Sequence, residues 1–134
     1  MALTVEIIMP GEKVEFLHVK SVVFESADGQ VGILPGHIPL LGLMRAGVLH
    51  LTTGDGNPRF ATSEGLARIH DDRVTFLVND LIAEADIREE DALRDYESLS
   101  KAVNSLAVSG REERLKELDF AKARLDLLGI KPPH

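Results

Sequence analysis

The chain has 134 residues and a formal net charge of −7, and 44% of its residues are hydrophobic. This hydrophobic content is enough for a packed core, and the length corresponds to one or two compact units. Because cysteine is absent, disulfide bonds, thiol catalysis and thiolate zinc sites are excluded. The negative charge argues against a nucleic-acid-binding protein, which would present a basic surface.

Neither a metal site nor a membrane span is predicted. The histidines are scattered along the chain, and no two of them have the spacing of metal ligands on a helix. No apolar segment approaches the roughly 20 residues needed to cross a bilayer, and the N-terminus lacks the features of a signal peptide. We therefore expect a soluble protein that reaches a membrane only through a partner.

Residues 1–85 show the pattern of an all-β domain. Alternating or apolar segments are separated by turn-forming residues at intervals of roughly eight to twelve residues. Strands are predicted at residues 3–7, 19–24, 48–52, 59–62, 66–69 and 74–78. The segment 54–58 and the Asp71-Asp72 pair predict tight turns. A sheet with one apolar face must stack or close, so we expect a sandwich or flattened barrel of eight to ten short strands.

Residues 86–134 have a helical period instead. The apolar positions of the two predicted helices are Leu93, Tyr96, Leu99, Val103 and Leu106, then Leu115, Leu118, Ala121, Leu125 and Leu128. Asp86 and Ser109 each precede a glutamate by three positions, which predicts the two N-caps. Gly110 separates the helices, and Gly129 ends the second. The short connection predicts an antiparallel hairpin. Each helix has a narrow apolar stripe, which could pack against the other helix, against the β-domain or against a helix of another protein.

No group of residues predicts a catalytic centre. The Ser63-Glu64-Gly65 sequence lacks the features of a nucleophile elbow. His37 lies in a segment with two prolines and a glycine, so we expect it to fix the loop or contact a partner. A small sandwich enzyme that uses His37 as a base is an alternative. The residues alone thus predict a two-part interaction protein without an active site, a cofactor or a metal.

Residues 24–41, with the sequence FESADGQVGILPGHIPLL, resemble the signature of ATP synthase epsilon subunits. The shared pattern is an acid-Gly turn, a Gly-Ile pair and a Pro-Gly-His-x-Pro-Leu-Leu segment. Further matches follow in order at residues 45–49, 62–66, 74–78 and 83–87, so the resemblance covers essentially the whole chain. It implies a flattened antiparallel β-sandwich of about ten strands over residues 1–85 and an antiparallel two-helix hairpin over residues 86–134.

The resemblance also implies a function, that of a non-catalytic rotor subunit in the central stalk. Such a subunit couples proton or sodium flow to ATP synthesis at the cytoplasmic face of the bacterial inner membrane. Its β-domain binds the gamma subunit and touches the ring of c subunits. By this resemblance Asp28, Gln30 and Val31 are expected to contact the ring loops. Pro35, Gly36 and His37 are expected to shape a rigid loop.

The hairpin, by the same resemblance, regulates ATP hydrolysis by folding against the β-domain or extending toward the alpha and beta subunits. Lys122 and Arg124 are expected to contact those subunits. Some members bind ATP through an Ile/Leu-Asp-x-x-Arg-Ala motif, of which Asp91 and Arg94 are present here, whereas the small last position is Asp95. We therefore expect at most weak ATP binding through Asp91, Arg94 and Lys122. A stand-alone nucleotide-binding sensor is the alternative function.

Overall fold

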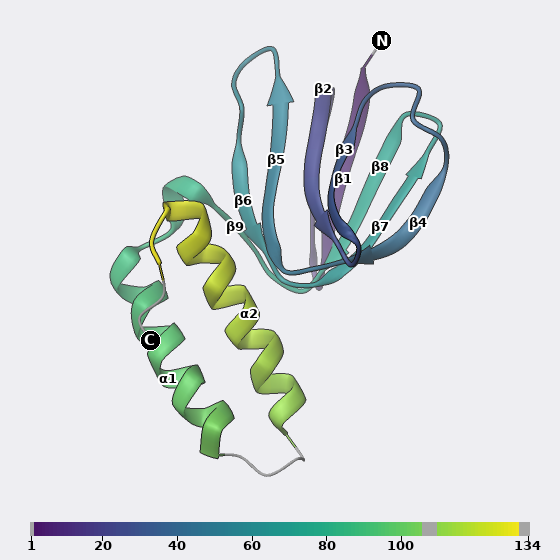
Figure 1. The fold of residues 1–134 in the computed structure, drawn as a ribbon. Helices are drawn as coiled ribbons and strands as arrows, with labels where there is room; N and C mark the ends of the chain where they lie inside the picture. Colours follow the sequence, from purple (N-terminus) through teal and green to yellow (C-terminus); the bar gives the residue numbers. More distant parts are fainter. Residues whose placement is uncertain (1, 106–109, 132–134) are drawn as a thin grey trace.

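The computed structural model describes residues 2–105 and 110–131. A β-domain is followed by two helices that lie beside one end of it (Figure 1). The elements of the described part are β1 (Leu3–Met9), β2 (Glu12–Ser26), β3 (Gly29–Ile33), β4 (Leu40–Met44), β5 (Gly47–Thr53), β6 (Arg59–Thr62), β7 (Gly65–His70), β8 (Arg73–Val78), β9 (Leu81–Ala83), the 3₁₀ turn η1 (Glu84–Asp86), α1 (Glu89–Ser105) and α2 (Arg111–Leu128). The predicted fold class, a β-sandwich followed by a helical hairpin, is confirmed.

The long strand β2 belongs to both layers of the sandwich. Its first half pairs with β1, and its second half lies between β3 and β5. One layer therefore has the order β3-β2-β5-β6-β9 and the other the order β2-β1-β8-β7-β4. The strand passes between the layers at a bulge, where His18 has a φ of 57°. The pairs are antiparallel apart from β1 with β8, which is parallel.

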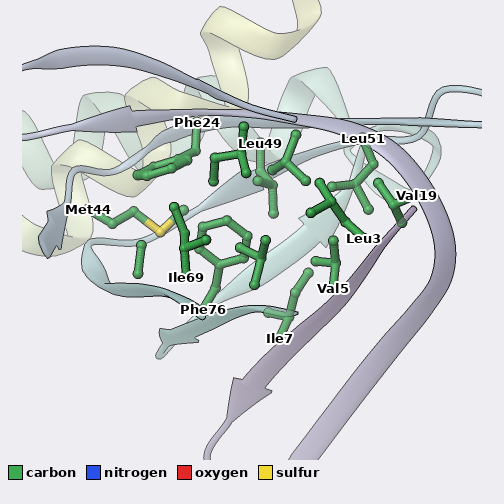
Figure 2. Packing of buried hydrophobic residues seen from close by; sticks show 14 of the residues in the cluster. Leu3, Val5, Ile7, Val19, Phe24, Met44, Leu49, Leu51, Ile69 and Phe76 are labelled. Atoms are coloured by element: carbon green, nitrogen blue, oxygen red, sulfur yellow. The ribbon is translucent and has the colours of Figure 1, made fainter. Parts of the chain in front are cut away.

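The core lies between the two layers and is built from residues of the strands alone. Leu3, Val5 and Ile7 of β1 point inward, and each is at most 1% exposed. Their side chains meet those of β2, β5, β7 and β8, as Figure 2 shows. The rings of Phe24 and Phe76 pack edge to face with centroids 5.3 Å apart. Because no helix residue of the described part of the chain belongs to this cluster, the sandwich has a core of its own.

The start of β7 is fixed by a close backbone contact and by a buried hydroxyl. A Cβ atom at Gly65 would lie 1.9 Å from the carbonyl oxygen of Leu77, so only glycine fits there. Two residues earlier, the Oγ of Ser63 accepts hydrogen bonds from the backbone N–H groups of Asn79 and Asp80, at 3.1 and 3.0 Å. Ser63 thus shapes the turn between β8 and β9, which is a structural role.

The helix boundaries differ from the prediction at the start of each helix. Asp86 ends the turn η1 instead of capping α1, so the predicted cap is wrong. Ile87 is extended, its N–H donates to Glu84, and its side chain packs against the sandwich before α1 begins at Glu89. Gly110, with a φ of 87°, is the N-cap of α2. The predicted cap Ser109, the stripe residue Leu106 and the prolines at 132–133 lie outside the described residues.

The C-terminus of α2 is as predicted. Gly129 has a φ of 75°, and its N–H donates to the carbonyl of Asp126 at 3.0 Å. The N–H of Ile130 donates to the carbonyl of Leu125 at 2.9 Å, which completes a Schellman motif.

Helix α2 lies between α1 and the sandwich and is buried on two sides (Figure 1). The predicted stripe is confirmed at Leu118, Ala121 and Leu125, which are buried, whereas Leu115 is 38% exposed. A second stripe was not predicted. It consists of Phe120, Ala123 and Leu127, which pack against Ala61, Val48, Ile82 and Ile87. The second stripe attaches the hairpin to β5 and β6.

Candidate functional site

Five apolar side chains cover the outer surface of the layer that contains β4, β7, β8 and β1. In the strand register Leu43 lies opposite Leu66, Leu66 opposite Leu77, and Leu77 opposite Ile8. Leu41 lies two residues along β4 on the same surface. The exposed fractions are 72% for Leu41, 65% for Leu43, 40% for Leu66 and 45% for Leu77. We name these residues, with Ile8, the leucine face. A contiguous apolar surface of this kind marks an interaction site.

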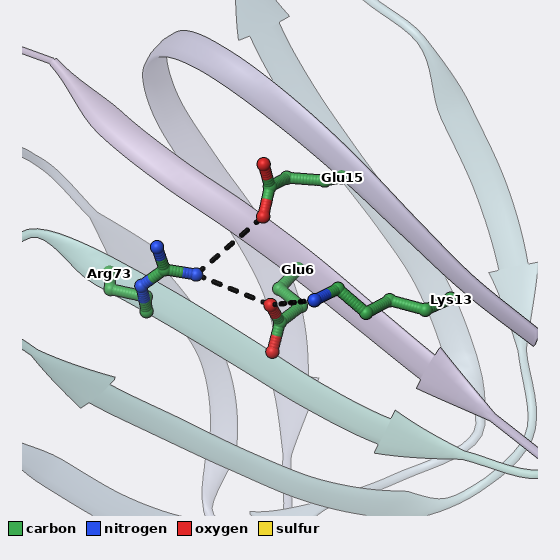
Figure 3. Close-up of polar contacts among 4 residues, drawn as sticks. All are labelled: Glu6, Lys13, Glu15 and Arg73. Carbon is green, nitrogen blue, oxygen red and sulfur yellow. Dashed lines mark hydrogen bonds and ion pairs between the residues drawn. The ribbon is translucent and has the colours of Figure 1, made fainter.

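A network of charged side chains from β1, β2 and β8 is drawn in Figure 3, and one member, Lys13, pairs in register with Ile8 of the leucine face. Glu6 lies on β1 two residues before Ile8, and its carboxylate accepts from Lys13 at 2.9 Å and from Arg73 at 3.2 Å. Arg73 also lies 3.6 Å from Glu15. The side chain of Glu6 is only 13% exposed, which holds the network against the sheet. An apolar centre with a charged border is the usual composition of a protein interface.

The segment that contains Pro35, Gly36 and His37 forms a type II turn between β3 and β4. The N–H of His37 donates to the carbonyl of Leu34 at 3.1 Å, and Gly36 has the positive φ, 85°, that this turn requires. The N–H of Gly36 also donates to the carboxylate of Asp72 at 2.7 Å. The imidazole Nδ1 of His37 lies 2.8 Å from the backbone oxygen of Ile38, so it is held by the main chain.

The turn between β2 and β3 carries the residues expected at the c ring. The Oγ of Ser26 donates to the carbonyl of Gly29 at 2.8 Å and accepts from the N–H of Asp28 at 3.1 Å. Asp28 and Gln30 are exposed, whereas Val31 is half-buried against the core.

The structure separates these residues from the Pro35 turn. Asp28 precedes β3 and Pro35 follows it, so the two predicted contact regions lie at opposite ends of one strand. The β2–β3 turn is at the end near α2, because Ala27 and Lys122 line the same groove. The Pro35 turn lies beside the β7–β8 turn, which contains Asp72.

The structure does not bring the three expected ATP ligands together. Asp91 and Arg94 form an ion pair with each other on α1. Lys122 lines a groove of about 810 Å³ between α2 and the β4–β5 corner, together with Arg45 and Asp126. Arg124 points the other way, and its guanidinium lies 2.9 Å from the carboxylate of Asp95 on α1.

Arg59 joins the two parts of the chain. Its Nη2 donates to the carboxylate of Glu84, in η1, and to the carbonyl oxygen of Leu127 at 3.2 Å. The hydrogen bond from Arg59 lowers the pKa of the Glu84 carboxyl below its ordinary value. Arg59 therefore holds the C-terminal end of α2 and the turn before α1 on strand β6.

In the ranges 2–105 and 110–131, no group of His, Asp and Glu side chains could hold a metal ion. No helix within the described residues is long and apolar enough to cross a membrane.

Sequence reasoning missed both the leucine face and the Arg59 contact. The leucine face has a detectable signal, because Leu66, Leu77 and Leu43 occupy positions where an alternating strand should have polar residues. The contacts of Arg59 and the pairing of Asp95 with Arg124 have no such signal, since they join residues 25 to 68 positions apart.

Comparisons with known proteins find relatives in sequence and neighbours in fold. The family model for the ATP synthase, Delta/Epsilon chain, beta-sandwich domain matches residues 2–84. The chain is 34% identical over 126 residues to the chloroplastic ATP synthase epsilon chain of Emiliania huxleyi. This alignment covers 93% of this chain and 97% of the relative. The chain is 33% identical over 133 residues to the ATP synthase epsilon chain of Synechococcus sp. strain RCC307, with 98% of each covered.

Solved structures with the same fold include a chain of the Euglena gracilis mitochondrial ATP synthase. The TM-score is 0.79 at 16% identity, and the alignment covers 95% of this chain and 81% of the other. A chain from the central stalk and c ring of the Tetrahymena thermophila mitochondrial ATP synthase gives a TM-score of 0.67 at 15% identity, with 92% and 97% covered.

Proposed function

This chain belongs to the ATP synthase delta/epsilon family, and from that membership we propose that it is a rotor subunit in the central stalk of an F-type ATP synthase. In this role it has no catalytic centre of its own. It couples proton or sodium flow to ATP synthesis and regulates ATP hydrolysis through its C-terminal helices. Similarity to epsilon chains supports the proposal, because the sequence alignments span both the sandwich and the helices. The proposed location is the cytoplasmic face of a bacterial inner membrane, reached through the complex.

The leucine face is the observation that carries this proposal. We assign it to the gamma subunit, so that residues 1–85 form the part that anchors the chain to the shaft. Burial of one leucine contributes about 1.5–3 kcal/mol, so several leucines on one surface can supply a stable attachment. The charged border of Glu6, Lys13 and Arg73 would fix the register of the partner.

The Pro35 turn is assigned to the same partner as the leucine face. Leu34, 64% exposed, and Ile38, 73% exposed, give this segment apolar side chains that are available to a partner. The contact from Gly36 to Asp72 holds the turn in one conformation, which suits a surface that transmits torque. Asp28 and Gln30, at the other end of β3, remain the residues proposed to meet the c ring, and Val31 supports their turn from the core side.

Residues 86–134 are proposed as the regulatory part. The hairpin is held to the sandwich by the stripe of Phe120, Ala123 and Leu127, which is small compared with the core of the sandwich. An element with a limited apolar contact can exchange it for another partner. Release would expose this stripe and Arg124, which could then contact the alpha and beta subunits together with Lys122.

Binding of the full chain to a cognate catalytic head that contains its gamma subunit tests the assignment. The variant Leu43→Glu/Leu66→Glu places two charges in the centre of the leucine face, and the matched control is Leu17→Glu, at a leucine outside the face that is 58% exposed. We expect the double variant to weaken binding by roughly a hundredfold or more, as at interface hot spots, and the control to bind like the wild type. Equal binding by all three folded proteins would contradict the assignment.

A further inference from the structure

Arg68 is an exposed arginine on the same outer surface as the leucine face. It lies two residues after Leu66 on β7, and alternate residues of a strand share one surface about 6.6 Å apart. In the strand register Arg68 lies opposite Leu41 of β4 on one side and opposite Thr75 of β8 on the other. A partner that covers Leu41 and Leu66 therefore covers Arg68 as well.

The charge of Arg68 has no counter-charge within the chain. The carboxylates nearest to it along the two strands are already paired, since that of Glu6 lies 3.2 Å from Arg73 (Figure 3) and that of Asp71 lies 3.4 Å from His70. Of the residues that the structure describes, none forms an ion pair or a side-chain hydrogen bond with Arg68. The guanidinium group is therefore satisfied by water in the isolated chain.

The surface is hollowed on both sides of Arg68. A groove of about 350 Å³ on the side of β4 is lined by Arg68 together with Leu41 and His70. A second groove, of about 250 Å³ on the side of β8, is lined by Arg68 and His70 together with Arg73 and Thr75. A side chain of a partner can therefore reach the guanidinium group from either side without displacing a strand.

Burial of this arginine has a consequence for the partner. When the leucines are covered, Arg68 loses water, and a charge that is removed from water without an opposite charge strongly disfavours the complex. A carboxylate removes this penalty, because the planar guanidinium group binds it through two parallel hydrogen bonds. An apolar or basic group at the same place would be rejected, so Arg68 discriminates between partner surfaces of similar shape.

We propose that Arg68 is a specificity-determining residue of the leucine face, which requires an aspartate or glutamate of the gamma subunit opposite it. The matching surface of the gamma subunit is then apolar opposite Leu41 and Leu66 and bears a carboxylate between them. This inference rests on the proposed attachment of the leucine face to the gamma subunit. It adds the charge that the attached surface must carry.

The affinity of the full chain for a cognate catalytic head that contains its gamma subunit measures the contribution of Arg68. We expect Arg68→Gln to weaken binding by roughly thirtyfold, and Arg68→Glu by more, because attraction is lost in the first variant and replaced by repulsion in the second. The matched control is Lys20→Gln, which removes a positive charge at an exposed position of β2 outside the leucine face. It should bind like the wild type. Urea unfolding should give similar stabilities for all three variants, since both side chains are exposed.

A charge exchange identifies the partner group. The acidic surface residues of the gamma subunit are changed to lysine one at a time, and one of these changes should weaken binding of the wild-type chain. The same gamma variant should bind Arg68→Glu more tightly than the wild-type gamma subunit does, because the ion pair is restored with its charges reversed.

Weaker binding by both Arg68 variants, with rescue at one position of the gamma subunit, supports the proposal. Binding of Arg68→Gln like the wild type would overturn it, as would the absence of rescue at every position. If Leu43→Glu/Leu66→Glu weakens binding and Arg68→Gln does not, the attachment through the leucine face stands and only the role of Arg68 fails. Absence of binding by the wild-type chain would contradict the proposed function, and the role of Arg68 with it.

Discussion

The backbone N–H of Gly36 donates to the side-chain carboxylate of Asp72 at 2.7 Å, although 36 positions separate the two residues. Gly36 is the left-handed residue of the turn between β3 and β4, and Asp72, with a φ of 60°, belongs to the turn between β7 and β8. The contact ties together two turns at one end of the sandwich. It gives the most characteristic segment of the sequence a fixed position beside the β7–β8 turn.

Loss of this contact should loosen the Pro35 turn. We expect Asp72→Ala to lower the free energy of unfolding by about 1–2 kcal/mol, because a donor loses its charged acceptor and alanine disfavours a positive φ. Asp72→Asn keeps an acceptor and tolerates this φ, so its effect should be smaller. Hydrogen exchange at the Gly36 amide should accelerate in the alanine variant. Unchanged exchange there would show that the carboxylate does not hold the turn.

Gly65 and Gly42 form a matched pair for testing the close contact at the start of β7. In Gly65→Ala the new Cβ would lie 1.9 Å from the Leu77 oxygen, so β7 and β8 must separate. We expect a loss of more than about 4 kcal/mol in unfolding free energy, or failure to fold. At Gly42 a Cβ meets no atom within 4 Å, so Gly42→Ala should be neutral or slightly stabilising. Urea unfolding of both variants checks this, and similar stabilities would contradict the packing described here.

The Arg59–Glu84 contact predicts a pH dependence of hairpin docking. The hydrogen bond from Arg59 lowers the pKa of folded Glu84 below the ordinary value of 4.5. The stabilisation is therefore fully present above about 4.5 and is lost as the pH falls through the lower folded pKa. In Arg59→Gln the pKa of Glu84, followed by NMR of its carboxyl carbon, should rise toward the ordinary value. Arg94→Gln removes an arginine paired elsewhere and should leave it unchanged.

ATP should not raise the melting temperature of the isolated chain. Asp91 and Arg94 form an ion pair with each other, and Arg124 forms an ion pair with Asp95. Lys122 lines a groove on the side of α2 that faces the sandwich. A ligand stabilises a folded protein only if it binds the folded state. Thermal unfolding with increasing ATP, against sodium sulfate of equal ionic strength, makes the comparison. A saturable rise specific to ATP would favour the alternative function, a nucleotide-binding sensor.

Much of the fold follows from the sequence because most strands bury only one surface. The alternation of Leu3, Val5 and Ile7 predicts β1, and similar patterns predict β5, β6, β7 and β8. The pattern fails at β4, where leucines occupy both surfaces, and at β3, which contains two glycines. It also underestimates β2, which continues through the bulge at His18. β3 and β4 are thus missed because their outer surface or backbone conformation departs from a simple sandwich, and β9 is missed because its three residues are too few to show an alternating pattern.

The candidate site is less predictable, since it depends on contacts between distant residues. The β2–β3 and β3–β4 turns can be located in the sequence, but not the fact that they lie at opposite ends of β3. From the sequence alone, Arg124 is one of several basic residues that alternate with acidic residues along α2, and a solvent-exposed position is expected for it. Its carboxylate partner, Asp95, lies 29 positions earlier on α1. This pairing cannot be inferred from the period of the helix.

The most direct test of the central claim is the rate of ATP hydrolysis by a cognate catalytic head and shaft, with the full chain or with residues 1–85 added. Among the residues that the structure describes, the sandwich core contains none from a helix, so the shorter chain should fold, and circular dichroism checks that it does. We predict that both bind and that only the full chain slows hydrolysis, because the sandwich is the anchor and the hairpin the regulator. Equal rates with both chains bound would contradict the regulatory role, and absence of binding by the full chain would contradict the assignment to the rotor.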